Sequence, residues 1–576
     1  MTAQLTPGAI KVLERRYLKR DDAGHVVETP DEMFRRVASN VAGAELRYEA
    51  GPGPEKAGRE FYAVMSSLEF LPNSPTLMNA GRRLQQLAAC FVMPVEDSIG
   101  SIFDAVKSTA LIHQSGGGTG FSFSHLRPAG DVVSSTGGAA SGPVSFMRVF
   151  NATTEAIKQG GTRRGANMGI LRVDHPDIVE FVTAKERPGE FTNFNLSVAV
   201  TDAFMAALER DGEYPLVNPR TGLETSRKRA AEVFDLIVRS AWSTGEPGVI
   251  FIDRVNAANP TPGLGPMEAT NPCGEQPLLA YEPCNLGSVN LSRMLKREAG
   301  RRVIDLDKLE RVVRTGVRFL DDVIDTSRYP TAEIDRMAKG NRKVGLGVMG
   351  FADMLARLRV PYASAEALDI AGEVMGFVHD TAWDESAALA RERGPFPNIK
   401  GSVFDRPGSR PVRNATVTTV APTGTLSIIA GCASGIEPFY ALSYTRRVLD
   451  GEVIEELNPL VEEIAREEGF YSEDLIEFVA RGGDLKERAD VPDAVKEVFA
   501  TAFAISAADH VRMQAAFQRH TDNAVSKTIN LAPESGPEDV KKAYLLAYAL
   551  GCKGVTVYRA GARAGQVLTC ADTLYC

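Results

Sequence analysis

Three residues with complementary chemistry alternate within one short segment of the chain: Asn271, Cys273 and Glu275. They offer an amide for hydrogen bonding, a redox-active thiol and a carboxylate that can act as a general base. The segment 271–284 also contains three prolines and a glycine, which oppose a regular helix or a central strand. We therefore predict a loop of fixed shape with the three side chains on one side. A structural turn around a buried cysteine is the alternative.

The cysteines are too sparse for a disulfide scaffold, since there are only seven in 576 residues. No two are spaced C-x2-C, and the chain has only seven histidines, so a zinc ribbon is not indicated. We predict reduced or catalytic thiols. The positions are Cys90, Cys273, Cys284, Cys432, Cys552, Cys570 and Cys576.

Three further segments could bind phosphate. Residues 422–427 (PTGTLS) follow a β-like run, and their hydroxyl and backbone N–H groups at a helix start could form an anion pocket. An ordinary helix cap is the alternative. The glycine-rich segments 115–120 and 159–165 could let the backbone approach a phosphate, and Arg163 and Arg164 in the second add forked donors.

The composition is that of a soluble globular protein, with 44% hydrophobic and 24% charged residues. With 74 acidic and 65 basic residues the net charge is −9, which argues against nucleic acid as a general partner. The N-terminus has no apolar targeting segment. The uncharged stretch 414–436 is rich in Thr, Ser, Pro and Gly, so it is not predicted to cross a membrane. We expect a cytoplasmic protein.

The elements that must position these side chains change in character along the chain. Residues 1–70 are predicted to form a small helical N-terminal region. From 71 to 558, short apolar runs alternate with glycine-rich turns and helical patterns, as in 343–350 followed by 351–358. This alternation is typical of an α/β core with mostly parallel strands. Residues 559–576 have little apolar periodicity and are predicted to be a flexible tail.

Six motifs occur in the order that ribonucleotide reductases carry them. They are residues 73–81 (NSPTLMNAG), 90–98 (CFVMPVEDS), 163–168 (RRGANM), 271–275 (NPCGE), 422–427 (PTGTLS) and 551–558 (GCKGVTVY). The chain resembles this family over residues 10–576, and more narrowly its adenosylcobalamin-dependent class II members of dimeric type. The resemblance implies a ten-stranded α/β barrel of two parallel five-stranded halves, with a central finger loop.

The resemblance also implies a role for each residue of the cysteine motif and its partners. Cys273 would become a thiyl radical and abstract the ribose 3′ hydrogen. Glu275 would take the proton of the 3′ hydroxyl, and Asn271 would hold the substrate hydroxyls. Cys90 and Cys284 would protonate the departing 2′ hydroxyl and then form a disulfide, which supplies the two electrons of the reduction. The product would be a 2′-deoxyribonucleotide.

Substrate binding is likewise implied by the resemblance. The substrate phosphates would contact Thr423, Gly424, Thr425 and Ser427, with Ser74 nearby. Likeness to dimeric members favours ribonucleoside diphosphates as substrates.

The resemblance also implies a regulatory site that is separate from the catalytic one. Asp97 and Ser98, with the loops around 133–142 and 159–170, resemble the site where a deoxynucleoside triphosphate or ATP effector selects the base to be reduced. In dimeric members this site lies at the subunit interface, so a homodimer is expected.

The tail cysteines would connect the enzyme to its reductant. Cys570 and Cys576 match the family's shuttle pair, which passes electrons from a thioredoxin-type protein to the inner disulfide. Five residues separate them, whereas four are familiar in related tails. Cys432 and Cys552 match no catalytic role and are predicted to be packing residues.

Comparison with the family's classes indicates which cofactor would generate the radical. Where class I large subunits carry two adjacent tyrosines, this chain reads Val557-Tyr558, and no glycyl-radical segment is present near the C-terminus. Adenosylcobalamin is therefore the expected cofactor. No Asp-x-His-x-x-Gly motif occurs, so no protein ligand to cobalt is expected. Two alternatives stay open: a class I large subunit with a diverged tyrosine path, and a non-catalytic nucleotide sensor, which would have no need of the thiols.

Overall fold

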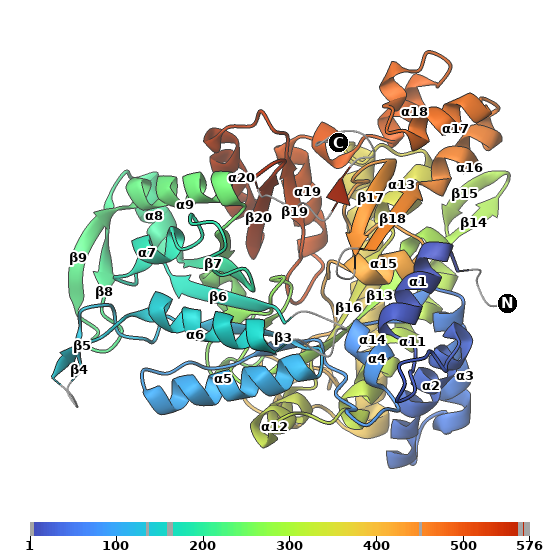
Figure 1. The fold of residues 1–576 in the computed structure, drawn as a ribbon. Coiled ribbons are helices and arrows are strands. Elements are labelled where there is room, and N and C mark those ends of the chain that lie inside the picture. The colour runs from blue at the N-terminus through green and yellow to red at the C-terminus, as the bar shows by residue number, and fades with distance from the viewer. Residues whose placement is uncertain (1–4, 134–136, 158–164, 449–451, 563–567, 570–576) are drawn as a thin grey trace.

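The computed structural model describes residues 5–133, 137–157, 165–448, 452–562 and 568–569 (Figure 1). The chain begins with three helices, α1 (Pro7–Arg16), α2 (Pro30–Ala42) and α3 (Gly53–Ser66). Helix α2 starts with a capping box, because Thr29 accepts from the Glu32 N–H and the Glu32 side chain accepts from the Thr29 N–H. Its apolar face, which includes Met33 and Val37, is buried. Helices thus dominate the first 66 residues, as the sequence predicts.

One half of the main sheet consists of five parallel strands that are neighbours in space. They are β2 (Cys90–Val92), β3 (Gly118–Ser122), β6 (Asn167–Arg172), β7 (Phe194–Val200) and β10 (Gly248–Phe251). Helices between them cover this half: α5 (Ile99–Gln114), α6 (Pro143–Ala156), α7 (Ile178–Val182), α8 (Asp202–Glu209) and α9 (Ala230–Thr244). Strand β10 leads into the short helix α10 (Ile252–Ala257). Strand–helix alternation explains the parallel order.

The other half is also parallel within itself. Strand β13 (Pro283–Asn290) pairs with β16 (Val344–Met349), and β19 (Thr528–Leu531) pairs with β20 (Gly554–Arg559). Between β16 and β19 runs the segment 416–420, which makes the isolated parallel bridges Leu346↔Thr418 and Val420↔Val525.

The two halves meet antiparallel, β13 against β2 and β10 against β20, so the strands close into a ring. This confirms the predicted ten-stranded α/β barrel. One detail differs: segment 416–420 takes a barrel position without forming a regular strand. The tenth strand of the sheet is instead β1 (Phe70–Pro72), which pairs antiparallel with the end of β13.

A finger enters the ring between the two halves. It is a short hairpin of β11 (Ala269–Thr270) and β12 (Pro277–Leu278) that contacts β3 and β6. The prediction of a loop over residues 271–284 was wrong at 277–278 and at 283–284, which belong to β12 and β13, because a proline is tolerated at the start of a short strand. Pro277 begins β12 and Pro283 begins β13 in this way.

Glycines of β3 let the finger approach. A Cβ on Gly120 would lie 1.7 Å from the Thr270 carbonyl oxygen, and one on Gly118 would lie 2.8 Å from Pro272. Residues 115–120 were predicted to approach a phosphate. For Gly118 and Gly120 the structure gives a different reason for glycine, which is the close packing of the β3 backbone against the finger.

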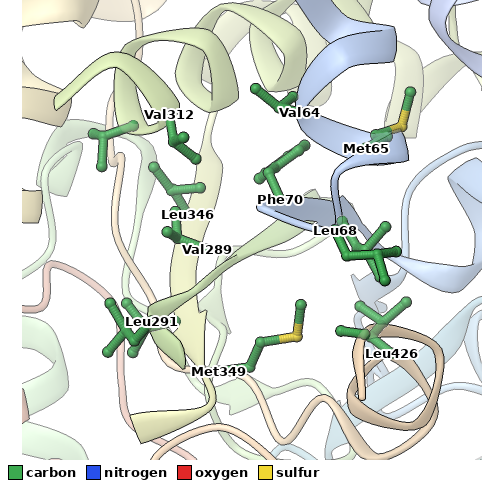
Figure 2. Packing of buried hydrophobic residues seen from close by; sticks show 14 of the residues in the cluster. Val64, Met65, Leu68, Phe70, Val289, Leu291, Val312, Leu346, Met349 and Leu426 are labelled. Atoms are coloured by element: carbon green, nitrogen blue, oxygen red, sulfur yellow. The ribbon is translucent and has the colours of Figure 1, made fainter. Parts of the chain in front are cut away.

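The largest core lies between the second half of the barrel and the helices outside it (Figure 2). Phe70 of β1, Val289 of β13 and Leu346 of β16 meet Val312 on α11 (Leu306–Thr326) and Val64 on α3, all fully buried. A separate cluster fills the inside of the ring around the finger and includes both Cys90 and Cys284. Burial of this apolar surface fixes the barrel wall on which the thiols stand.

The other helices complete the structure. They are α4 (Ser74–Asn79), α12 (Ala332–Asn341), α13 (Phe351–Leu358), α14 (Ala365–Arg393), α15 (Gly424–Ala430), α16 (Pro459–Glu468), α17 (Glu473–Ala480), α18 (Asp493–Val498), α19 (Ala507–Gln518) and α20 (Pro537–Ala549). Small antiparallel hairpins pair β4 (Val132–Val133) with β5 (Gly138–Ala139), β8 (Glu213–Val217) with β9 (Glu224–Arg229), β14 (Leu295–Glu298) with β15 (Arg301–Ile304), and β17 (Ser443–Val448) with β18 (Glu452–Leu457); β21 (Leu568–Thr569) pairs with β17. Among the described residues, no helix has the length and apolar character needed to cross a bilayer.

Candidate active site

Two cysteines face each other across the junction of the barrel halves. The antiparallel register of β2 and β13 places Cys90 directly opposite Cys284. Opposite residues in such a ladder have Cα atoms about 4.5–5.5 Å apart and project to the same face. Disulfides span Cα separations of about 4.4–6.8 Å, so this register allows the two thiols to be joined without moving the strands. Both cysteines are reduced in the structure.

The surroundings keep the thiol of Cys284 protonated. Burial raises its pKa well above the usual cysteine value, and the opposing effect of the Lys343 charge does not offset this. Cys90 is also buried, and the amide Nδ2 of Asn271 lies 3.1 Å from its sulfur. The finger residue thus touches one member of the thiol pair directly.

A buried ion pair fixes the strand end that carries Cys284. Lys343 donates to Oε2 of Glu282 at 2.8 Å, and both side chains are almost fully buried. The same carboxylate accepts from the Leu279 N–H at 2.8 Å and from Asn341 at 2.6 Å. The carbonyl of Lys343 in turn lies 3.7 Å from the Cys284 sulfur. The sequence analysis did not single out this pair, because Glu282 and Lys343 have no motif spacing and meet only in the fold.

The finger tip is a tight turn closed by hydrogen bonds. Asn271 donates its N–H to the Gln276 carbonyl at 3.1 Å and accepts from the Gln276 N–H at 3.0 Å through its side chain. Gly274 takes a φ of +82°, which glycine adopts without strain, and donates to the Asn271 carbonyl. Asn195 of β7 donates to the Pro272 carbonyl at 2.7 Å, which ties the tip to the first half of the barrel.

Cys273 stands on the wall of a cavity of about 860 Å³. This volume is near the upper end of the ~300–1,000 Å³ typical for small-molecule sites. The three functional side chains, predicted to lie on one side of the loop, differ in exposure: Cys273 is exposed, whereas Asn271 and Glu275 are buried. The tight turn at Gly274 separates them. The backbone carbonyl of Glu275 accepts from Thr419 and from the Ala524 N–H, both at 2.9 Å, which ties the finger to the second half of the barrel.

The predicted phosphate contacts lie at the start of α15. Gly424 and Ser427 line the same cavity as Cys273. Thr423 has a φ of +55°, and its hydroxyl accepts from the Gly435 N–H at 2.7 Å, so this side chain stabilises the turn before the helix. Thr425 is half-buried and is not among the residues that line the cavity.

The N-terminal region reaches the same cavity. Thr6, Pro7 and Gly8 at the start of α1 line it, and α1 packs against α15. Ser74, which begins α4, lies 2.7 Å from the Tyr17 hydroxyl but is not part of the cavity wall.

Other cavity residues carry chemistry that the motifs did not assign. Lys527 pairs with Glu437 at 2.6 Å, and burial lowers the pKa of the lysine. Tyr440 and Tyr558 also line the cavity, and burial raises the pKa of Tyr440 to about 12. The sequence analysis did not single out Lys527, because it lies outside the six motifs.

The predicted effector residues lie at the start of α5. Asp97 accepts from the Arg127 side chain at 2.8 Å and from the Arg127 N–H at 3.2 Å. Ser98 caps α5 by accepting from the Ser101 N–H at 3.2 Å. Parts of the two effector loops, residues 134–136 and 158–164, lie outside the described residues, as do Cys570 and Cys576.

A histidine connects this region to the finger. His125 contacts Glu96, the neighbour of Asp97, and Glu268, which precedes β11, each at 2.9 Å. The hydrogen bond to Glu268 is the main reason that the pKa of His125 is raised to about 9, and Glu96 adds to it. The positively charged ring thus bridges two carboxylates at neutral pH.

The geometry can now be compared with known proteins. A family model described as the ribonucleotide reductase barrel domain matches residues 88–558, and one described as the all-alpha domain of ribonucleotide reductase matches residues 3–85. The chain belongs to the ribonucleotide reductase family. Within the described residues, no group of three or more His, Cys, Asp or Glu side chains is arranged to hold a metal ion.

Its relatives carry informative names. The chain is 49% identical to a vitamin B12-dependent ribonucleoside-diphosphate reductase of Thermoplasma acidophilum, over 98% of this chain and 80% of the relative. It is 51% identical to a protein of the same name from Mycobacterium tuberculosis, over 99% and 81%. Among solved structures, the Actinobacillus ureae class Id ribonucleotide reductase alpha subunit matches with a TM-score of 0.79 at 23% identity, covering 97% of both chains. This last likeness bears on the fold alone.

Proposed function

We propose that this protein reduces ribonucleoside diphosphates to 2′-deoxyribonucleotides by thiyl-radical chemistry that adenosylcobalamin initiates. One observation carries the proposal: the Cys90–Cys284 pair stands in register across β2 and β13, in contact with the finger that presents Cys273 to the cavity. The names of the relatives at 49% and 51% identity agree with it. A nucleotide sensor has no use for this arrangement of thiols.

The proposed reaction balances with the groups present. Cys273, as a thiyl radical, takes the 3′ hydrogen of the ribose and returns it at the end of the cycle. Glu275 accepts the proton of the 3′ hydroxyl, and Asn271 holds the substrate hydroxyls. Cys90 and Cys284 give a proton to the leaving 2′ hydroxyl, which departs as water. Their conversion to a disulfide supplies the two electrons that replace C–OH by C–H.

The electrostatics of the thiol pair suit this role. A proton donor must hold its proton until the leaving group develops, and burial keeps Cys284 in the thiol form. The low-dielectric interior of the barrel also shields a radical on Cys273 from competing reactions. The buried Lys343–Glu282 pair positions β13 and does not ionise the thiol.

The cavity fits a cofactor beside the substrate. It extends from the start of α15, past Cys273, to Asn195 and Tyr558 on the opposite strands, so it is larger than the phosphate region requires. Asn195, Tyr440 and Tyr558 would contact the corrin, whose amide groups suit polar and aromatic partners. When bound, adenosylcobalamin supplies one-electron chemistry through its cobalt–carbon bond.

Substrate binding is proposed at the other end of the cavity. Gly424 and Ser427, supported by Thr423, Thr425 and Ser74, would hold the phosphates. The nucleotide would then extend towards Cys273 along the cavity that Gly424, Ser427 and Cys273 line.

The effector site and the dimer are proposed together. Asp97 and Ser98 would bind the deoxynucleotide or ATP effector at the start of α5. The same helix exposes three large apolar side chains, Ile99 at 62%, Phe103 at 49% and Leu111 at 38%. A second copy of the chain would cover them, which supports a homodimer built on α5.

The remaining proposals concern organisation and reductant. Residues 1–70 would act as the helical region, 71–558 as the catalytic barrel and 559–576 as a redox tail. Cys570 and Cys576 of that tail would receive electrons from a thioredoxin-type protein. We expect the enzyme to work in the cytoplasm, where thioredoxin systems keep such thiols reduced.

The decisive experiment is CDP reduction with adenosylcobalamin and dithiothreitol by wild type, Cys273→Ala and Cys432→Ala. Cys432 lines the same cavity but has no assigned role, so it is the matched control. We expect no turnover from Cys273→Ala with unchanged nucleotide binding, and near wild-type turnover from the control. Ordinary turnover by Cys273→Ala would refute the mechanism. Activity that needs a separate radical subunit and ignores cobalamin would favour the class I alternative.

A further inference from the structure

A second cavity, of about 440 Å³, opens in the N-terminal helical region. It shares no lining residue with the catalytic cavity. Its described lining consists of Arg15, Arg16, Leu18, Lys19, Arg20, Gly81, Arg82 and Arg83. Six of these eight residues are cationic and none is acidic, in a chain whose net charge is −9. Such a concentration of one sign raises the local potential for anions.

The position of Arg82 is fixed while its charge is only partly neutralised. It donates to the Tyr17 carbonyl at 2.6 Å and approaches Glu28 at 3.4 Å. Glu28 is bound more closely by Arg36, at 2.6 Å. The Nε of Arg82 is buried and has no hydrogen-bond partner among the described residues. Burial and the charge of Arg36 lower the pKa of Arg82, which shows that positive charge is crowded here.

The other cations are arranged around this fixed arginine. Arg20 is braced by backbone carbonyls, those of Glu14 at 2.7 Å and Gly24 at 2.5 Å, so these contacts orient its guanidinium without neutralising it. Lys19 and Arg83 are exposed on the rim. Guanidinium groups present paired donors that match phosphate oxygens, and charge-assisted bonds of this kind are the strong ones.

We propose that this cavity binds the polyphosphate group of a small ligand, namely inorganic tripolyphosphate or the triphosphate of a nucleotide. Its volume suits a compact ligand rather than a polymer. No aromatic side chain is present in the described lining, so nothing there stacks on a base. Recognition therefore depends on the phosphates and is indifferent to the base.

The site is separate from the catalytic cavity and can be filled at the same time. Arg15 and Arg16 lie in the last turn of α1, whereas Thr6, Pro7 and Gly8 at its beginning line the catalytic cavity. A helix of 10 residues is roughly 15 Å long, so the two sites lie at opposite ends of it. The polyphosphate site is therefore distinct from the substrate phosphate site.

The test is calorimetric titration of the full chain with sodium tripolyphosphate in the presence of saturating CDP, which fills the substrate site. No deoxynucleotide effector is added, because its own triphosphate would occupy the proposed site. We expect one further site per chain. The variant Lys19→Gln/Arg83→Gln should bind tripolyphosphate at least about tenfold more weakly, because it loses two charge-assisted hydrogen bonds to the phosphates. The matched control Lys56→Gln/Arg59→Gln removes the same charges from α3 and should bind as wild type does.

The outcomes separate the alternatives. Competition between ATP and tripolyphosphate for the further site supports recognition of the phosphates alone. Binding of ATP without binding of tripolyphosphate would overturn it, since the base would then be required. Equal binding by the wild type and the Lys19→Gln/Arg83→Gln variant, or no further site in the wild type, would also overturn the proposal. Both substituted side chains are exposed, and equal thermal unfolding temperatures will verify that the variants fold.

Discussion

Replacing Gly120 by alanine tests whether close packing of the finger on β3 places Cys273. A Cβ at this position would lie 1.7 Å from the Thr270 carbonyl oxygen, whereas real Cβ contacts essentially never fall below 3.0 Å. The finger or the strand must therefore move by at least about 1.3 Å, the difference between the two distances. The obstacle is backbone, so no side-chain rotation can relieve it.

A shift of this size should cost activity more than stability. Misplacing a reacting group by about 1 Å can lower the rate about 10²-fold. Overpacking of this kind destabilises by about 1–3 kcal/mol, which a barrel with several cores tolerates. We therefore expect kcat for CDP reduction to fall about 100-fold in Gly120→Ala, while the unfolding transition remains cooperative. Single-turnover assays with pre-reduced enzyme will measure the effect on chemistry alone.

Gly372→Ala provides the matched control. Gly372 lies inside α14, and a Cβ there would have nothing within 4 Å. Alanine favours a helix over glycine, so this variant should keep full activity and be slightly more stable. Wild-type turnover by Gly120→Ala would refute the reasoning, because the finger would then tolerate displacement from β3.

Two further predictions follow from named contacts, and a third concerns the cysteines near the C-terminus. Lys343→Met removes the cation that pairs with the buried Glu282 carboxylate. The free energy of unfolding, measured with urea, should therefore fall by about 3–5 kcal/mol. A loss below about 1 kcal/mol would contradict the conclusion that the two side chains form a buried ion pair. His125 has a pKa raised from 6.5 to about 9, so its contribution to stability is fully present below pH 6.5 and is lost as the pH rises through about 9. The unfolding temperature of wild type should therefore fall more between pH 7 and 9.5 than that of His125→Gln, and parallel curves would contradict the bridge. Changing Cys570 and Cys576 to Ser should abolish multiple turnover with thioredoxin but retain it with dithiothreitol; full thioredoxin-driven turnover would show that the tail is not the shuttle.

The sequence predicted the barrel because its signals are local and repeated. Residues 344–349 and 351–358 form the strand β16 and the helix α13, as their apolar run and helical pattern indicate. Prediction was poorer at the finger, where Pro277 and Pro283 suggested a loop throughout. Proline opposes the interior of a strand but not its first residue, and strand starts are not visible in a pattern of prolines.

The sequence pointed to the cysteines of the candidate site, but not to the residues that hold them in place. The family resemblance pointed to Cys90, Cys273 and Cys284, which the structure places on β2, the finger tip and β13. No sequence signal could pair Glu282 with Lys343, because the pair depends on how β13 and the start of β16 lie in the fold. Supports of this kind become visible only when distant segments are placed side by side.

The thiol pair shows why this barrel needs two halves that run in opposite directions. Within either half the strands are parallel, and parallel neighbours are joined by a helix on the outside. At the junction, β2 and β13 are antiparallel, so Cys90 and Cys284 meet directly across one ladder position. The finger enters beside the same junction, and Asn271 contacts Cys90 from it. The junction therefore brings the loop that carries Cys273 into contact with the Cys90–Cys284 pair.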